Sequence, residues 1–139
     1  MAELLPTERL QPSLLDRLTD DDPDKRQESR EQRVLSVNRL RQSVLRDMAW
    51  LLNSVCLESV QSLENHPEVR DSVLNYGIPD MSGHHISLND MPYLERRIRE
   101  AILAFEPRIL PATLKVTVAT SEEFNHNALS FDILGDLWM

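Results

Sequence analysis

The chain has 139 residues, 41% of them hydrophobic and 27% charged, which is ordinary globular usage and argues against a disordered or fibrous protein. This length suits one domain with a single core. The net charge of −8 at pH 7 disfavours nucleic acid as a partner, because binding to a phosphate backbone needs clustered Lys and Arg.

The N-terminal part is predicted to be a short helix followed by an arm. Ser13 is a typical helix-capping residue, and three leucines follow it at helical spacing. Residues 19–26 contain Pro23 and no apolar residue, which is typical of a linker or mobile arm. An arm of this kind can dock on a partner, and the residues expected to do so are Leu14, Leu15 and Leu18.

Two helices are predicted next. The first is long and amphipathic, from about Glu28 to Val55, with neither Gly nor Pro inside it. Its apolar positions, three or four residues apart, are Val34, Val37, Leu40, Val44, Met48, Leu51 and Val55. A second, short helix is expected from Pro67 to Leu74, and residues 75–85 are expected to form a loop, because they contain two glycines, Pro79 and two histidines.

A further helix is predicted after this loop. Residues 87–90 resemble a capping box, and Pro92 is tolerable in a first helical turn. Pro107 disfavours helical geometry at Glu106, so the helix should stop there. Its apolar stripe consists of Met91, Leu94, Ile98, Ile102 and Phe105.

The last part of the chain changes to the period of a β-strand. Apolar and polar residues alternate in 113–118 and again in 129–133, which predicts an antiparallel hairpin. Helices followed by strands indicate an α+β fold, with N-terminal helices packed on a small antiparallel C-terminal sheet. We therefore expect residues 1–27 to form the short helix and mobile arm, and residues 28–139 to form the α+β domain.

A two-stranded hairpin is marginal alone, and its two edges carry unpaired backbone groups. This sheet therefore needs helices on one face and a further strand, which another chain could supply by strand addition. Leu134 and Trp138 fall on the face opposite Leu129, Phe131 and Ile133. They are exposed apolar surface unless the N-terminal helices cover them, and both alternatives remain open.

The sequence offers little for catalysis or metal binding. Glu123 and Asp132 have the nine-residue spacing of two acids in phage-type lysozymes, but Trp138 stands where that signature has threonine. The histidines and the single cysteine, Cys56, lack metal-ligand spacing. We expect no enzyme activity, no metal and no cofactor.

The segment Glu106-Pro107-Arg108 places opposite charges on either side of a rigid proline at a helix-to-strand junction. One interpretation is a structural salt bridge inside the domain. The other is a charged peg for a partner, in which Arg108 forms bidentate bonds to a carboxylate.

With Ile109, this segment forms an E-P-R-I motif that resembles the gp25-like baseplate proteins of contractile phage tails and their type VI secretion relatives. Further stretches are similar to the type VI branch, the TssE family, in particular. They are residues 10–21, 40–53, 72–80 and 131–138. The family usually continues past Leu137 and Trp138 with another strand-like segment, whereas this chain stops at Met139.

The resemblance implies a structural subunit that joins the baseplate wedge to the first ring of the contractile sheath. It implies wedge core subunits (TssF/TssG type) as partners of Glu106, Pro107, Arg108 and Ile109. It also implies sheath subunits (TssB/TssC type) as partners of a strand edge, because the family's β part is similar to the handshake domain of the sheath protein. The residues expected at this edge are Leu129, Phe131, Ile133, Leu134, Leu137 and Trp138.

The expected location is the bacterial cytoplasm, at a baseplate docked on the inner-membrane complex. No stretch approaches the roughly 18 apolar residues of a membrane span, so we expect no direct membrane insertion, and a monomer outside the complex. The competing functions are a peptidoglycan hydrolase, which a cell-wall cleavage assay would reveal, and a generic adaptor unrelated to contractile machines.

Overall fold

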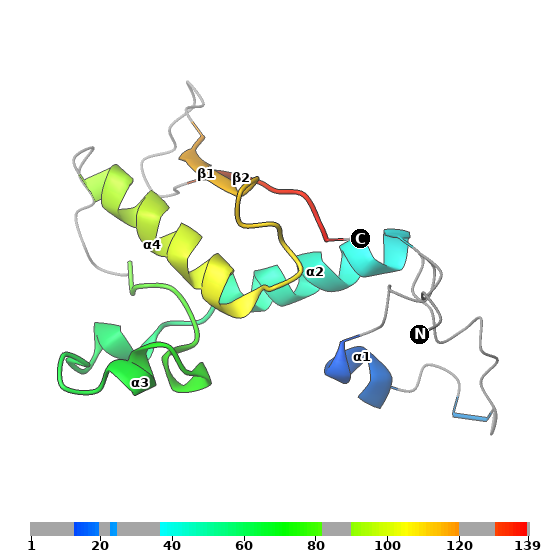
Figure 1. The fold of residues 1–139 in the computed structure, drawn as a ribbon, viewed down its shortest axis with the longest axis horizontal. Helices are drawn as coiled ribbons and strands as arrows, with labels where there is room; N and C mark the ends of the chain where they lie inside the picture. Colours follow the sequence, from blue (N-terminus) through cyan, green and yellow to red (C-terminus); the bar gives the residue numbers. More distant parts are fainter. Residues whose placement is uncertain (1–12, 20–22, 25–36, 82–89, 120–129, 139) are drawn as a thin grey trace, which may run out of the picture. The chain divides into compact units, whose positions relative to one another are not determined.

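The computed structural model describes residues 13–19, 23–24, 37–81, 90–119 and 130–138. Its elements, in chain order, are α1 (Leu14–Leu18), α2 (Val37–Leu52), η2 (Leu57–Ser59), α3 (Pro67–Arg70), η3 (Val73–Asn75), α4 (Met91–Phe105), β1 (Lys115–Val118) and β2 (Phe131–Leu134) (Figure 1). The chain divides into two compact units, one ending at Arg46 and one formed by Asp47–Trp138. The fold is α+β, as predicted. The assignment of residues 1–27 and 28–139 to separate parts stays a prediction.

Helix α1 confirms the short helix predicted after Ser13. The Ser13 side chain accepts a hydrogen bond from the Asp16 backbone N–H, and the Asp16 side chain accepts one from the Ser13 backbone N–H. This reciprocal capping satisfies donors that a helix start leaves unpaired. Within the predicted arm, residues 19–26, the structure describes Thr19, Pro23 and Asp24.

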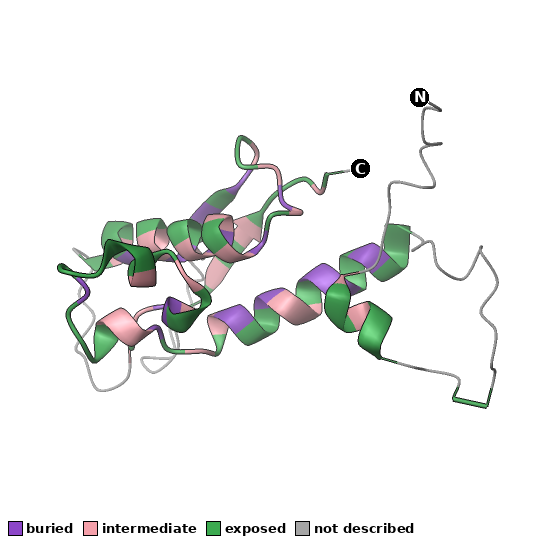
Figure 2. Cartoon of the chain, turned by 60° about the horizontal axis from the view of Figure 1, so that its bottom comes forward, coloured by how far each residue is buried: buried purple, intermediate pink, exposed green. Residues whose placement is uncertain are grey.

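The predicted long helix is confirmed in α2, but its end at Val55 is wrong. The helix ends at Leu52, and residues 28–36 lie outside the described residues. The chain leaves the helix because Ile78 donates to the Ser54 carbonyl and accepts from the Cys56 N–H, both at 2.9 Å. The buried part of the apolar stripe, purple in Figure 2, is Leu40, Val44, Met48 and Leu51, whereas Val37 and Val55 are exposed.

Gly77 makes this pairing with Ile78 possible. Its φ is +128°, and a Cβ there would lie 2.5 Å from the Ser54 carbonyl oxygen. Both the backbone conformation and the close approach therefore require glycine. The predicted helix 67–74 is also interrupted: α3 stops at Arg70, and Ser72 caps the separate turn η3 by accepting the Leu74 N–H.

Helix α4 ends at Phe105, as Pro107 predicts, and it contains Pro92 in its first turn. Its N-cap is Asp90, while Ser87 of the predicted capping box lies outside the described residues. Leu94, Ile98 and Ile102 are buried along one stripe. Helix α4 packs against β1 (Figure 1), where Val116 is buried, as is Leu114 just before the strand.

The predicted antiparallel hairpin is confirmed. Lys115 of β1 stands opposite Leu134 of β2, and Val118 stands opposite Phe131. Leu129, which was expected in the second strand, lies outside the described residues. Within the described part of the chain these two strands form the only sheet.

Candidate protein interaction site

Segment 130–138 pairs with segment 108–119 through β2 and, beyond β2, through the isolated bridge between Ile109 and Leu137. At its start, Ser130 accepts the Ala119 N–H at 2.9 Å. After the ladder with β1, the Asp136 carbonyl accepts the Leu110 N–H and the Trp138 N–H donates to the Arg108 carbonyl, both at 2.8 Å. The even-numbered residues therefore turn their backbone groups toward segment 108–119.

The odd-numbered residues turn their backbone groups the other way, because successive residues of an antiparallel strand alternate between bonding toward and away from a given neighbour. These residues are Phe131, Ile133, Gly135 and Leu137. Among the described residues, none makes a backbone hydrogen bond to this outer edge. At about 3.4 Å per residue, the outer edge from 131 to 137 is about 20 Å long. It is long enough to receive a strand.

Apolar side chains border this outer edge on both faces. Phe131, Ile133 and Leu137 are half-buried. Leu134 and Trp138 are 65% and 57% exposed. The described structure thus leaves both of these large side chains uncovered, and the use of this edge by a partner stays a prediction.

The charged residues of the E-P-R-I motif bond to each other. The Glu106 side chain is only 3% exposed and accepts from Arg108 Nε at 2.6 Å. Arg108 Nη2 bonds to both Glu106 and Asp47. The hydrogen bond to Glu106 raises the pKa of Arg108 above its ordinary value and outweighs the opposing effect of burial. The structural salt bridge considered from the sequence is therefore present, and a partner role for the motif remains untested.

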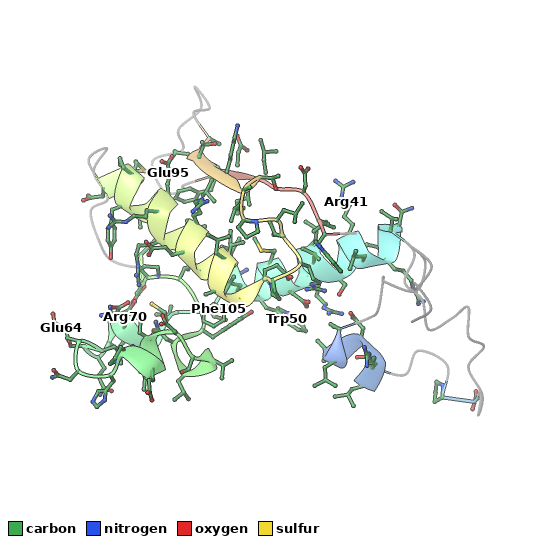
Figure 3. All side chains as sticks on the ribbon, in the orientation of Figure 1. Arg41, Trp50, Glu64, Arg70, Glu95 and Phe105 are labelled. Atoms are coloured by element: carbon green, nitrogen blue, oxygen red, sulfur yellow. The ribbon has the colours of Figure 1, made fainter. Side chains whose placement is uncertain are left out.

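Two residues of this cluster were not expected from the sequence. Asp47 lies far from Arg108 along the chain, so no spacing signal connects them. The Tyr76 ring packs edge-on against Phe105, labelled in Figure 3, with ring centroids 5.1 Å apart. Burial raises the pKa of Tyr76, and the charges of Asp47 and Glu106 raise it further.

The motif and the strand edge, predicted as separate sites, share one piece of backbone. The Arg108 side chain bonds to Glu106 and Asp47, and the Arg108 carbonyl accepts a hydrogen bond from the Trp138 N–H. Ile109 is buried and stands opposite Leu137 as an isolated bridge. Gly135 allows this close approach, since a Cβ there would lie 2.9 Å from the Ile109 side chain. The motif therefore positions the C-terminal end of the outer edge.

The predicted N-terminal docking residues lie on α1. Leu14, Leu15 and Leu18 are 73%, 40% and 75% exposed. Asp16 holds the helix, since its carboxylate accepts from Ser43 Oγ and from Arg46 Nη1, each at 2.8 Å. The leucines are thus presented from an anchored helix, and what they bind remains a prediction.

Replacing Asp16 with alanine should release α1. Burial alone would raise the pKa of Asp16, but hydrogen bonds from Ser13, Ser43 and Arg46, with the charge of Arg46, hold that pKa well below its usual range. A lowered pKa means that the carboxylate stabilises the helix fully above the ordinary value of about 4 and loses this effect only as the pH falls through the lowered value. Amide exchange at Arg17 and Thr19 should accelerate at neutral pH in Asp16→Ala and remain unchanged in Asp24→Ala. Equal exchange in both variants would contradict the anchoring role.

Asp132 is exposed on β2, and Glu123 lies outside the described residues. Within the described ranges, no three His, Cys, Asp or Glu side chains gather as metal ligands. No helix in those ranges has the length and apolar character needed to cross a membrane.

The chain matches a known protein family over most of its length. A family model described as baseplate wedge protein gp25 (GPW_gp25) matches residues 38–139. This span contains α2, α4, both strands and the E-P-R-I motif. No curated protein and no solved structure matches the chain.

Proposed function

Because most of its length matches the family model, the chain belongs to the baseplate wedge protein gp25 family, and from this premise we propose that it is a structural baseplate subunit of a type VI secretion system. In this proposal it connects the wedge to the contractile sheath and starts sheath assembly by strand addition. It works by binding and templating rather than by catalysis. The choice of a type VI system rests on the resemblance of residues 10–21, 40–53, 72–80 and 131–138 to that branch.

The observation that carries the proposal is the unfinished outer edge of segment 131–137. Along about 20 Å of this edge, the outward N–H and C=O groups have no backbone partner among the described residues, and such groups are a template for another extended segment. A sheath subunit of the TssB/TssC type would supply the missing partners. Backbone hydrogen bonds would give the contact its direction, and alternate side chains such as Phe131 and Ile133 would set its register.

The wedge side of the proposal uses the surface of the E-P-R-I motif, with core subunits of the TssF/TssG type as partners. Pro107 is exposed and Arg108 is half-buried, while Glu106 is inaccessible. Glu106 would therefore act by fixing Arg108, and Pro107 and Arg108 would make the contact. Since Arg108 also holds Trp138 through its carbonyl, wedge binding and the strand edge would share one rigid support.

The experiment is a sheath-seeding assay. The purified chain is added to sheath subunits, alone and with wedge core subunits, and sheath formation is followed by light scattering and electron microscopy. We expect the lag before sheath growth to shorten and the chain to be found at one end of each sheath. An unchanged lag, with the chain absent from the sheaths, would rule out the templating role. Cleavage of purified peptidoglycan by the chain would instead support an enzyme.

A further inference from the structure

The β1 edge of the hairpin differs from its β2 edge, because side chains of α4 bond to backbone groups along the β1 edge. The Val118 N–H points away from β2 and donates to Glu95 Oε1 at 2.8 Å. Arg99 Nε donates to the Leu114 carbonyl at 3.4 Å, and Arg99 Nη2 donates to the Pro111 carbonyl at 3.2 Å. Glu95 is labelled in Figure 3, where it extends from α4 on the side of β1.

The spacing of Glu95 and Arg99 lets both side chains reach the β1 edge. Glu95 and Arg99 are four residues apart, so they lie on one face of α4, one turn from each other. An acid accepts a backbone N–H, and a base donates to backbone carbonyls, so each charge suits its backbone partner. Val116, whose backbone groups lie between the two contacts, is only 8% exposed. Within the described residues, side chains of α4 therefore cover this margin of β1.

We infer that Glu95 and Arg99 close the β1 edge, so that a partner strand adds to the β2 edge alone. This inference rests on the proposed function of the β2 edge. A subunit with two open edges could add copies of itself head to tail without limit. A subunit with one closed edge can receive strands at its open edge only. Copies of such a subunit do not polymerise with each other.

The charge of the open edge indicates which strand it receives. Segment 130–138 contains Asp132 and Asp136, both exposed, and no basic residue. Like charges directly opposite each other destabilise a strand pair, and opposite charges stabilise it. Two copies of this chain would place their acidic strands against each other, so the favoured occupant is an extended strand of another protein with Lys or Arg opposite Asp132.

The test compares two double variants of α4. Glu95→Ala/Arg99→Ala removes the closing side chains. Arg96→Ala/Glu100→Ala removes one acid and one base from an exposed pair on the same helix and serves as the matched control. In sedimentation experiments we expect the first variant to self-associate as concentration rises, and the control to remain monomeric. A folded Glu95→Ala/Arg99→Ala protein that stays monomeric at every concentration would overturn the inference.

Amide exchange supplies a readout that needs no self-association. In the unmodified chain the Val118 amide should exchange at least tenfold more slowly than that of Ile133, although both point away from the hairpin. Glu95→Ala should remove this protection, and Glu95→Gln, which keeps a side-chain acceptor, should restore most of it. Equally fast exchange at Val118 and Ile133 in the unmodified chain would also overturn the inference.

Failure of this inference differs from failure of the proposed function. If the β1 edge proves open while the chain still seeds sheaths through β2, one-sided addition is wrong and the templating role stands. If Val118 is protected as expected but the chain seeds no sheath, the closed edge stands and the templating role fails.

Discussion

Ile133→Pro is expected to slow the seeding of sheath assembly strongly while leaving the hairpin folded. The Ile133 N–H points to the open side and makes no bond to β1, and proline is tolerated where a strand's N–H faces solvent. The substitution removes one donor and places a ring where the incoming strand must lie. We expect the rate of seeding to fall at least tenfold, measured in the light-scattering assay.

Ile133→Ala is the matched control, because it shortens the same side chain and keeps the N–H. It should seed sheaths more slowly than the unmodified chain but far faster than Ile133→Pro. Circular dichroism and the exchange rate of the Trp138 amide would verify that the hairpin persists in both variants. Equal seeding by Ile133→Pro and Ile133→Ala would show that this backbone edge is not the template.

Arg108→Met should lower the free energy of unfolding by about 3–5 kcal/mol, because it leaves the Glu106 carboxylate buried without its cation. Glu106 is 3% exposed, whereas Arg108 and Asp47 are 23% and 24% exposed. Chemical denaturation at neutral pH measures this change directly. Arg96→Met, from an exposed ion pair, should change stability by less than about 1 kcal/mol.

The double variant Glu106→Gln/Arg108→Met should recover part of the loss, since no buried charge remains uncompensated. No recovery would show that Arg108 stabilises the fold through Asp47 or through packing instead. Because variants of Glu106 or Arg108 are expected to destabilise the fold, a loss of wedge binding in them has to be compared with their stability. Pro107→Ala is the cleaner probe of the wedge contact, because Pro107 is exposed and its side chain makes no hydrogen bond.

The elements that the sequence predicted well have local causes. Helix α4 ends before Pro107 because the residue preceding a proline avoids helical geometry, and α1 begins after Ser13 because that side chain caps it. The end of α2 could not be predicted in this way. The apolar stripe of α2 continues to Val55, but Val55 pairs with the distant Ile78 and therefore lies outside the helix.

The charged contacts were the least predictable part of the candidate site. Glu95 and Arg99 have the pattern of a solvated helix face, and only the packing of α4 beside β1 brings them to backbone groups. Asp47 shares Arg108 with Glu106 across a large separation in sequence. Such partners are set by tertiary structure, whereas strand alternation and helix caps are set by neighbouring residues.

The most direct test of the open edge is amide exchange along 131–138, measured for the free chain and in the presence of sheath subunits. In the free chain, Phe131, Ile133, Gly135 and Leu137 should exchange fast, and Asp132, Leu134 and Trp138 slowly. Addition of sheath subunits should slow the first group and leave Val118 unchanged. Slow exchange of the odd-numbered residues before any partner is added would mean that the ribbon is already complete, and the account would be wrong.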